Sequence, residues 1–109
     1  MNYRIIVLPQ AIRDFEGCAA FVGKRSPKGE MALRAAFAKA TKSLEINAAV
    51  HGLAPESADH EIDIKQTFFR TRHGRPYRIL FTIDRDEVYL LHVRGPGQDF
   101  ITPDDLKLT

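Results

Sequence analysis

The sequence predicts an α+β domain in which a helical hairpin packs on one face of a mainly antiparallel sheet. Three observations predict this class. Residues 76–94 (PYRILFTIDRDEVYLLHVR) contain two apolar runs joined by a short charged turn, as in two consecutive strands. Two helical patterns precede them, and one short β-branched run precedes the helices. The expected order is therefore β-α-α-β-β-β, in a single domain that spans residues 1–109.

The expected hairpin supplies the centre of the sheet. Residues 77–83 place apolar side chains at alternate positions, which is the period-two pattern of a strand. Residues 84–86 are the turn-forming sequence DRD. Residues 88–93 are apolar on both faces except at His92, a composition typical of a central strand covered on both sides. Because an isolated hairpin is only marginally stable in water, other elements must cover it.

Those covering elements are expected upstream. Residues 3–8 form a β-branched strand that Pro9 ends, and a helix is expected near residues 11–25. Residues 26–29 (SPKG) break the pattern with a capping serine and a first-turn proline, and an alanine-rich helix follows over residues 30–46. The side chains expected on the faces that pack are Ile12, Phe15, Ala19 and Val22 in the first helix and Leu33, Phe37, Ala40 and Leu44 in the second.

The rest of the chain has weaker patterns. We expect a loop over residues 47–59, a strand over residues 61–72 with Phe69 on the face opposite to Ile62, Ile64 and Phe68, and a short terminal helix over residues 102–106. The side chains expected to be mostly buried are Phe15, Val22, Leu33, Phe37, Leu44, Ile79, Phe81 and Leu90.

Composition excludes several classes of protein. No apolar run approaches the roughly 20 residues that a membrane helix needs, and 28% of the residues are charged. The N-terminal apolar run is too short for a signal peptide. The single cysteine, Cys18, excludes an internal disulfide framework and a cysteine zinc site. We therefore expect a cytoplasmic protein without a metal ion, a cofactor or a membrane partner.

The charge pattern identifies a candidate functional surface. No acidic residue occurs between positions 64 and 83, where Lys65, Arg70, Arg72, Arg75 and Arg78 lie. If Arg70 and Arg72 share a strand face, antiparallel pairing brings Arg78 close to them and creates a phosphate-sized positive field. Two alternatives remain open. The cluster is a solvated edge that discourages aggregation, or Arg78 pairs with a carboxylate such as Asp63 or Glu61 and holds the sheet together.

The histidines provide one candidate proton-transfer group. His92 lies two residues before Arg94, so the two share a strand face, and an imidazole there could act as an acid or base beside a phosphate. The alternative is a hydrogen-bonded, half-buried sheet residue. The remaining histidines lie in or near loops without the spacing of metal ligands.

The order and spacing of these segments resemble the RelE/ParE superfamily of bacterial toxins, the toxin halves of type II toxin–antitoxin modules that include plasmid-stabilisation proteins. The resemblance rests on the strand YRIIVLP, the helix that begins at Ala11, the alanine-rich second helix, the run YRILF that starts at Tyr77 and the run VYLLHVR that ends at Arg94. It covers residues 3–99 and implies the β-α-α-β-β-β fold.

The resemblance also implies two possible activities. RelE-like members are ribosome-dependent messenger RNA endoribonucleases, whereas ParE-like members inhibit DNA gyrase. In the first case the implied catalytic residues are Arg78, His92, Arg70 and Arg72, with Lys65, Arg75 and Arg94 binding RNA phosphates. Residues 95–100 (GPGQDF) depart from the ribonuclease pattern, because they lack a basic residue and a tyrosine and Phe100 has no ionisable hydroxyl.

Three hypotheses therefore stand side by side. The chain is an endoribonuclease toxin acting on ribosome-bound messenger RNA, a non-enzymatic inhibitor of DNA gyrase, or an inactive domain that retains only antitoxin binding. In each case the partner is a cognate antitoxin, which relieves the growth inhibition in the first two. We expect an antitoxin segment to lay apolar side chains into a groove between helices and sheet, or to add an edge strand, with its acidic tail near residues 70–78.

Overall fold

A computed structural model of the chain describes residues 2–96, and every structural statement below concerns those residues. In chain order the elements are β1 (Arg4–Val7), α1 (Pro9–Gly23), α2 (Pro27–Asn47), the 3-10 turns η1 (Ala48–Val50) and η2 (Pro55–Asp59), β2 (Lys65–Phe69), β3 (Tyr77–Asp84) and β4 (Glu87–Arg94). The predicted α+β class and the order β-α-α-β-β-β are confirmed. The helix expected over residues 102–106 lies outside the described residues.

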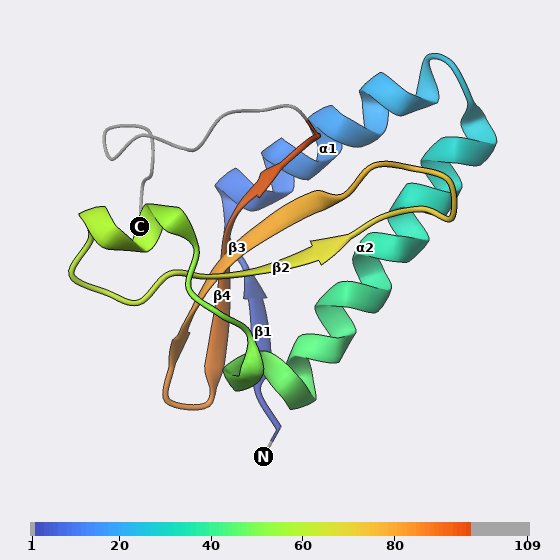
Figure 1. Cartoon of the computed structure of the whole chain (residues 1–109). Helices are drawn as coiled ribbons and strands as arrows, with labels where there is room; N and C mark the ends of the chain where they lie inside the picture. Colours follow the sequence, from blue (N-terminus) through green and yellow to red (C-terminus); the bar gives the residue numbers. More distant parts are fainter. Residues whose placement is uncertain (1, 97–109) are drawn as a thin grey trace.

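The four strands form one sheet in the order β1-β4-β3-β2 (Figure 1). β2, β3 and β4 pair antiparallel, and β1 pairs parallel with β4. β4 thus has a strand on each side, as its doubly apolar sequence predicts. β1 reaches only as far as the pair Val7 and Leu90, so the last residues of β4 have no strand on that side. This gap is where α1 approaches the sheet.

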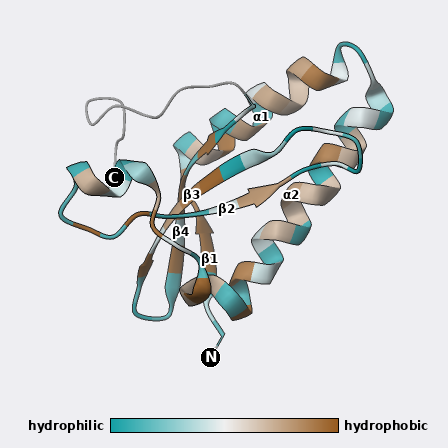
Figure 2. Cartoon of the chain, viewed as in Figure 1, coloured by the Kyte–Doolittle hydropathy of each residue, from teal (hydrophilic) through white to brown (hydrophobic). Residues whose placement is uncertain are grey.

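The two helices cover one face of the sheet and form the larger core with it (Figure 1). The rings of Phe15 and Phe37 stack at 4.1 Å between centroids, which joins α1 to α2, and Phe37 meets the edge of Phe69 at 5.3 Å. Phe69 therefore faces the helices, and it lies on the opposite face of the sheet from the exposed Phe68, as the alternation predicted. Apolar colour follows the helical sides turned toward the sheet (Figure 2). These contacts bury Phe15 and Phe69 and partly bury Phe37.

Six of the eight side chains expected in the core are buried, whereas Val22 and Phe37 are partly buried and pack against it. Ile12 was wrongly placed on the packed face, because 48% of its surface is exposed. The buried positions of α1 are Ala11, Phe15 and Ala19 instead. Small alanines at this spacing let α1 lie close to β4, while the larger Ile12 is turned outward.

Both helices begin earlier than expected. Pro9 is the first residue of α1, so it starts a helix as well as ending a strand. Ser26 caps α2, since its Oγ accepts a hydrogen bond from the N–H of Gly29 at 2.9 Å. With Ser26 as the cap, Pro27 occupies the first helical position, three residues before the expected start at residue 30.

The segment between α2 and β2 crosses the face of the sheet that the helices leave open (Figure 1). It contains η1 and η2, where the sequence suggested only a loop. Its side chains Ala54 and Ile64 pack with Leu80 and Leu91 of the sheet in a second, smaller core. The strand expected over residues 61–72 is shorter at both ends, since β2 covers only Lys65–Phe69. Just before β2 begins, the carbonyl of Ile64 accepts a hydrogen bond from the N–H of Ala54.

Candidate functional site

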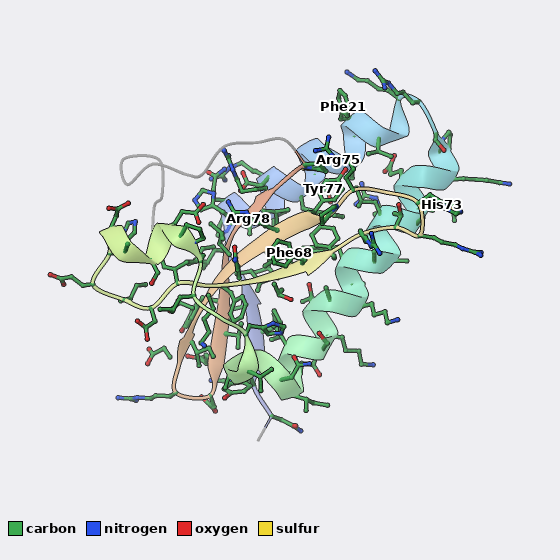
Figure 3. The ribbon with its side chains drawn as sticks, viewed as in Figure 1. Phe21, Phe68, His73, Arg75, Tyr77 and Arg78 are labelled. Carbon is green, nitrogen blue, oxygen red and sulfur yellow. The ribbon has the colours of Figure 1, made fainter. Side chains whose placement is uncertain are left out.

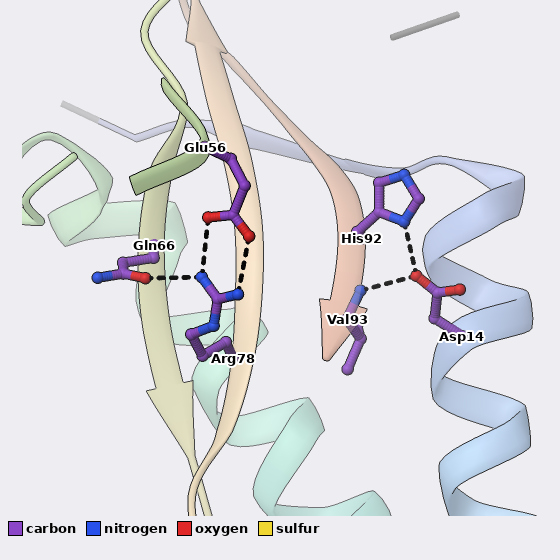
Figure 4. Close-up of polar contacts among 6 residues, drawn as sticks. All are labelled: Asp14, Glu56, Gln66, Arg78, His92 and Val93. Atoms are coloured by element: carbon purple, nitrogen blue, oxygen red, sulfur yellow. Dashed lines mark hydrogen bonds and ion pairs between the residues drawn. The ribbon is translucent and has the colours of Figure 1, made fainter. Parts of the chain in front are cut away.

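Arg78 lies on the open face in β3, opposite Phe68 of β2 and Arg94 of β4. Its guanidinium is held by two side chains (Figure 4). Nη1 donates to Glu56 Oε1 at 3.1 Å and to Gln66 Oε1 at 3.0 Å, and Nη2 donates to Glu56 Oε2 at 2.8 Å. The Glu56 side chain is 1% exposed and that of Arg78 is 14% exposed. This is a buried, two-point ion pair.

The alternative in which Arg78 pairs with a carboxylate is thus the observed geometry, but the expected partners were wrong. Glu56 takes the place of Asp63 or Glu61. It comes from the first turn of η2, which Pro55 opens and which lies over the sheet. No periodic pattern surrounds Glu56 in the sequence, so nothing local marked it as the partner of an arginine 22 positions later.

His92 lies against α1 rather than beside Arg78 (Figure 4). It is 5% exposed, and its Nδ1 lies 2.9 Å from Oδ2 of Asp14. The same carboxylate oxygen accepts the backbone N–H of Val93 at 3.0 Å. Because β1 ends before this part of β4, Asp14 satisfies an N–H that a longer strand would have bound. The sequence indicated His92, but nothing indicated Asp14.

The surroundings of Asp14 favour its ionised form beside His92. Burial raises the pKa of Asp14, but hydrogen bonds from His92, Gln10 and the Val93 N–H outweigh it and lower that pKa below its ordinary value. In the tautomer with its proton on Nδ1, the imidazole donates to this carboxylate. Nε2 is then an acceptor, and it is buried without a hydrogen-bond partner among the described residues. A carboxylate-oriented histidine of this kind has the chemistry of a base, but solvent does not reach it.

The other predicted basic residues have different environments. Arg70, Arg72 and Arg75 are exposed in the connection between β2 and β3, and Figure 3 shows Arg75 on this turn. The premise that Arg70 and Arg72 share a strand was wrong, because β2 ends at Phe69. Lys65 is directed to the backbone, with Nζ donating to the carbonyls of Ala49 at 3.3 Å and His51 at 2.6 Å. The structure therefore does not gather these residues around Arg78.

A groove of about 620 Å³ runs between α1 and the adjoining ends of β3 and β4. Phe21, Val22 and Tyr77 supply apolar walls, and Arg94 lies at the strand end. Gly17 also lines it, and a Cβ at this position would have no atom within 4 Å. Figure 3 shows Phe21 and Tyr77 at this end of the molecule. Its position between helix and sheet matches the groove expected for an antitoxin segment, although the sequence gave no sign of Phe21.

Neither a metal centre nor a membrane span is present in residues 2–96. No group of three histidine, cysteine, aspartate or glutamate side chains there could hold a metal ion. No helix of this part of the chain has the length and apolar character to cross a membrane. Among the carboxylate-bound side chains of this part of the chain, Arg78 and His92 are the ones with little exposure to solvent.

The order of elements, the helical hairpin on the sheet and the arginine-bearing β3 agree with one known family. A sequence model described as ParE toxin of the type II toxin–antitoxin system, parDE, matches residues 5–100. The chain belongs to the ParE toxin family. A comparison with curated proteins gave no match. This ParE-family chain is accordingly the toxin of a type II toxin–antitoxin module, and the family implies a cognate antitoxin as its partner.

Proposed function

We propose that this ParE-family toxin inhibits growth by binding DNA gyrase in the cytoplasm, without cleaving RNA. The observation that carries the proposal is the state of the two side chains best suited to catalysis. Arg78 is bound by Glu56 and Gln66, and His92 is bound by Asp14 and is 5% exposed. A catalytic arginine or base must reach the reacting phosphate. Membership of the ParE family supports the same target.

An endoribonuclease acting on ribosome-bound messenger RNA is the second candidate. The exposed Arg70, Arg72 and Arg75 favour it, because unburied guanidiniums on one turn suit phosphate oxygens. In that case Arg94 and Lys65 would add phosphate contacts, and Arg78 would first have to leave Glu56. Breaking a buried ion pair leaves a carboxylate uncompensated, at a cost of about 3–5 kcal/mol. This cost makes the binding mechanism the better supported one.

The experiment compares both activities in one preparation. Purified toxin is added to a gyrase supercoiling assay and to a translation reaction whose messages are mapped for new ends. We expect loss of supercoiling at toxin concentrations that leave every message intact. Cleaved messages together with unimpaired supercoiling would overturn the proposal in favour of the ribonuclease. Intact messages and normal supercoiling would overturn both in favour of an antitoxin-binding domain without toxicity.

We also propose that the groove along α1 receives the antitoxin. Two features support this proposal. Phe21, Val22 and Tyr77 form an apolar wall, and the exposed basic turn of residues 70–75 suits an acidic antitoxin tail. Gly17→Leu should fill the groove without disturbing the fold, because space over Gly17 is open. Ala20→Leu, on the exposed surface of α1 outside the groove lining, is the matched control. Co-expressed antitoxin should co-elute with the control and separate from the Gly17 variant; equal co-elution would contradict this placement.

A further inference from the structure

A second groove, of about 880 Å³, lies at the opposite end of β3 and β4 from the groove along α1. It opens on the face without helices, between the segment that precedes β2 and the ends of β3 and β4 nearest their shared turn. Its apolar lining consists of Leu8, Ile62, Ile83, Tyr89 and Leu91. The smaller core continues into it, since Leu8 and Tyr89 also pack against that core. The groove therefore has a rigid apolar base.

The β4 strand directs Leu91 into this groove through an irregularity in its pairing. The register between β3 and β4 shifts after Leu80, so that Leu80 faces His92 while Phe81 faces Leu90. The extra residue is Leu91, which is 2% exposed and belongs to the smaller core. Bulges re-aim side chains in this way and often accompany binding sites. Ile62 lies at the mouth with 40% of its surface exposed.

The rim of the groove is acidic. Glu61, Asp63 and Asp84 line it, and none of them forms an ion pair within residues 2–96. Lys65 also lines it, but its ammonium is directed to the carbonyls of Ala49 and His51. Of the charges on the neighbouring turn, Arg4 pairs with Glu87, and Arg85 occupies the tip between two aspartates. The carboxylates thus remain uncompensated around apolar surface.

Two groups of exposed basic residues lie at the other end of β3 and β4. They are the arginines of the β2–β3 connection and Lys24 and Arg25 between α1 and α2, on the side where Tyr77 and Val22 line the other groove. The acidic rim and these two basic groups therefore lie at opposite ends of β3 and β4. An acidic rim repels phosphate and attracts cationic side chains, and field lines concentrate in a groove with low-dielectric walls. Nucleic acid is accordingly excluded as the occupant.

We propose that this groove binds a basic amphipathic segment of a partner protein. Apolar side chains of the segment lie on Leu8, Ile62 and Tyr89, and its lysines or arginines meet Glu61, Asp63 and Asp84. In an extended peptide, alternate side chains point in opposite directions. Apolar and basic side chains that alternate can therefore contact the apolar base of the groove and its acidic rim at the same time. The site is distinct from the antitoxin groove, and the proposal does not depend on the target of the toxin.

The test uses the full chain and a fluorescein-labelled heptapeptide in which lysine and leucine alternate. Anisotropy should show saturable binding that weakens as salt is raised, and a peptide with glutamate in place of lysine should not bind. Glu61→Gln with Asp63→Asn should raise the Kd about fivefold, as expected for two rim contacts. Glu45→Gln with Asp59→Asn removes the same charge outside the groove and should leave the Kd unchanged.

Ile62→Ser provides a second readout. Because 40% of the surface of Ile62 is exposed, the substitution should leave the fold intact, which circular dichroism checks. This variant should also bind the lysine–leucine peptide more weakly than the wild type does. Equal Kd values for the rim and control variants would overturn the proposal, as would equal binding of the glutamate peptide. Sedimentation that shows dimers of the chain alone, dissociated by the rim variant, would also overturn it and assign the groove to a second copy.

Discussion

Arg78 and Glu56 form a two-point ion pair that ties η2 to the open face of the sheet, with Nη1 to Oε1 at 3.1 Å and Nη2 to Oε2 at 2.8 Å. The pair joins residues that are 22 positions apart. Gln66 adds a third contact from β2, so the guanidinium bridges three segments of the chain. An arginine in this position stabilises the arrangement of η2, β2 and β3 whatever further role it has.

Replacing Arg78 by alanine should therefore destabilise the fold. The carboxylate of Glu56, with a side chain only 1% exposed, would remain buried after losing both of its contacts with the guanidinium. Removal of one member of a buried pair costs about 3–5 kcal/mol. Urea unfolding followed by circular dichroism measures this loss. The double variant Arg78→Leu with Glu56→Leu removes both charges and should recover much of it.

Arg75→Ala is the matched control, because Arg75 is an exposed arginine on the adjoining turn. It should change the free energy of unfolding by less than about 0.5 kcal/mol. If Arg78→Ala kept full stability while abolishing growth inhibition, the guanidinium would belong to the functional surface. That outcome would favour a role of Arg78 in RNA cleavage over a purely structural role.

The Asp14–His92 pair predicts an acid-dependent loss of stability. The pKa of Asp14 is lowered in the fold below its ordinary value of 3.8, so the native state binds a proton less readily than the unfolded chain. Its contribution is therefore complete above 3.8 and is lost as the pH falls through the lower folded value. Asp14→Asn keeps the shape but not the charge. The gap in unfolding free energy between wild type and variant should shrink as the pH falls below 3.8.

Asp59→Asn serves as the control for Asp14, because Asp59 is exposed at the end of η2. It should alter the free energy of unfolding by less than about 0.5 kcal/mol at pH 7. Urea unfolding repeated between pH 3 and pH 7 provides the profile. A gap between wild type and Asp14→Asn that widened as the pH fell below 3.8 would contradict the direction assigned to the pKa of Asp14.

Phe81 and Phe68 offer a matched pair for testing the two faces of the sheet. Phe81 is completely buried in the larger core, whereas 53% of the surface of Phe68 is exposed on the open face. Phe81→Ala should cost about 3–5 kcal/mol through the lost transfer energy and the cavity left behind. Phe68→Ala should cost far less. Chemical denaturation of both variants checks this, and equal losses would show that Phe68 is covered in solution.

The sequence predicted the elements that depend on local pattern. The alternation in residues 77–83 and the doubly apolar run before Arg94 identified β3 and the central β4. Ser26 and Pro27 were recognised as capping and first-turn residues, but the start of α2 was placed three residues too late. Ile12 was misplaced because a helical stripe read from large side chains overlooks Ala11, whose small size brings α1 close to the sheet.

The partners of the candidate site residues could not be predicted in this way. Arg78 and His92 were identified from their own positions, as polar groups inside apolar strands. Their carboxylates, Glu56 and Asp14, come from a 3-10 turn and from a helix surface 78 positions from the histidine. Which of several acidic residues reaches an arginine depends on the path that the connecting segment takes over the sheet. Local sequence patterns do not predict that path.

The last prediction concerns the exposed basic turn. Changing Arg70, Arg72 and Arg75 together to glutamine should leave stability nearly unchanged, since all three side chains are exposed. If the turn is the surface that meets phosphates, binding of the toxin to single-stranded RNA should weaken. The slope of log K against log salt should then become shallower by about 2, since each lost phosphate contact contributes about 0.7. Fluorescence anisotropy with a labelled oligonucleotide measures both quantities.

The matched control changes Lys24, Arg25 and Lys28 to glutamine, which removes the same charge from the exposed connection between α1 and α2. We expect a clearly smaller change in slope for this control. Its side chains belong to a solvated helix surface and lie outside residues 64–83, the segment without acidic residues. Equal changes in the two variants would trace the RNA affinity to net charge alone. In that case the basic turn is a solvated edge that protects β2 from aggregation, and the ribonuclease hypothesis loses the one exposed cluster that favours it.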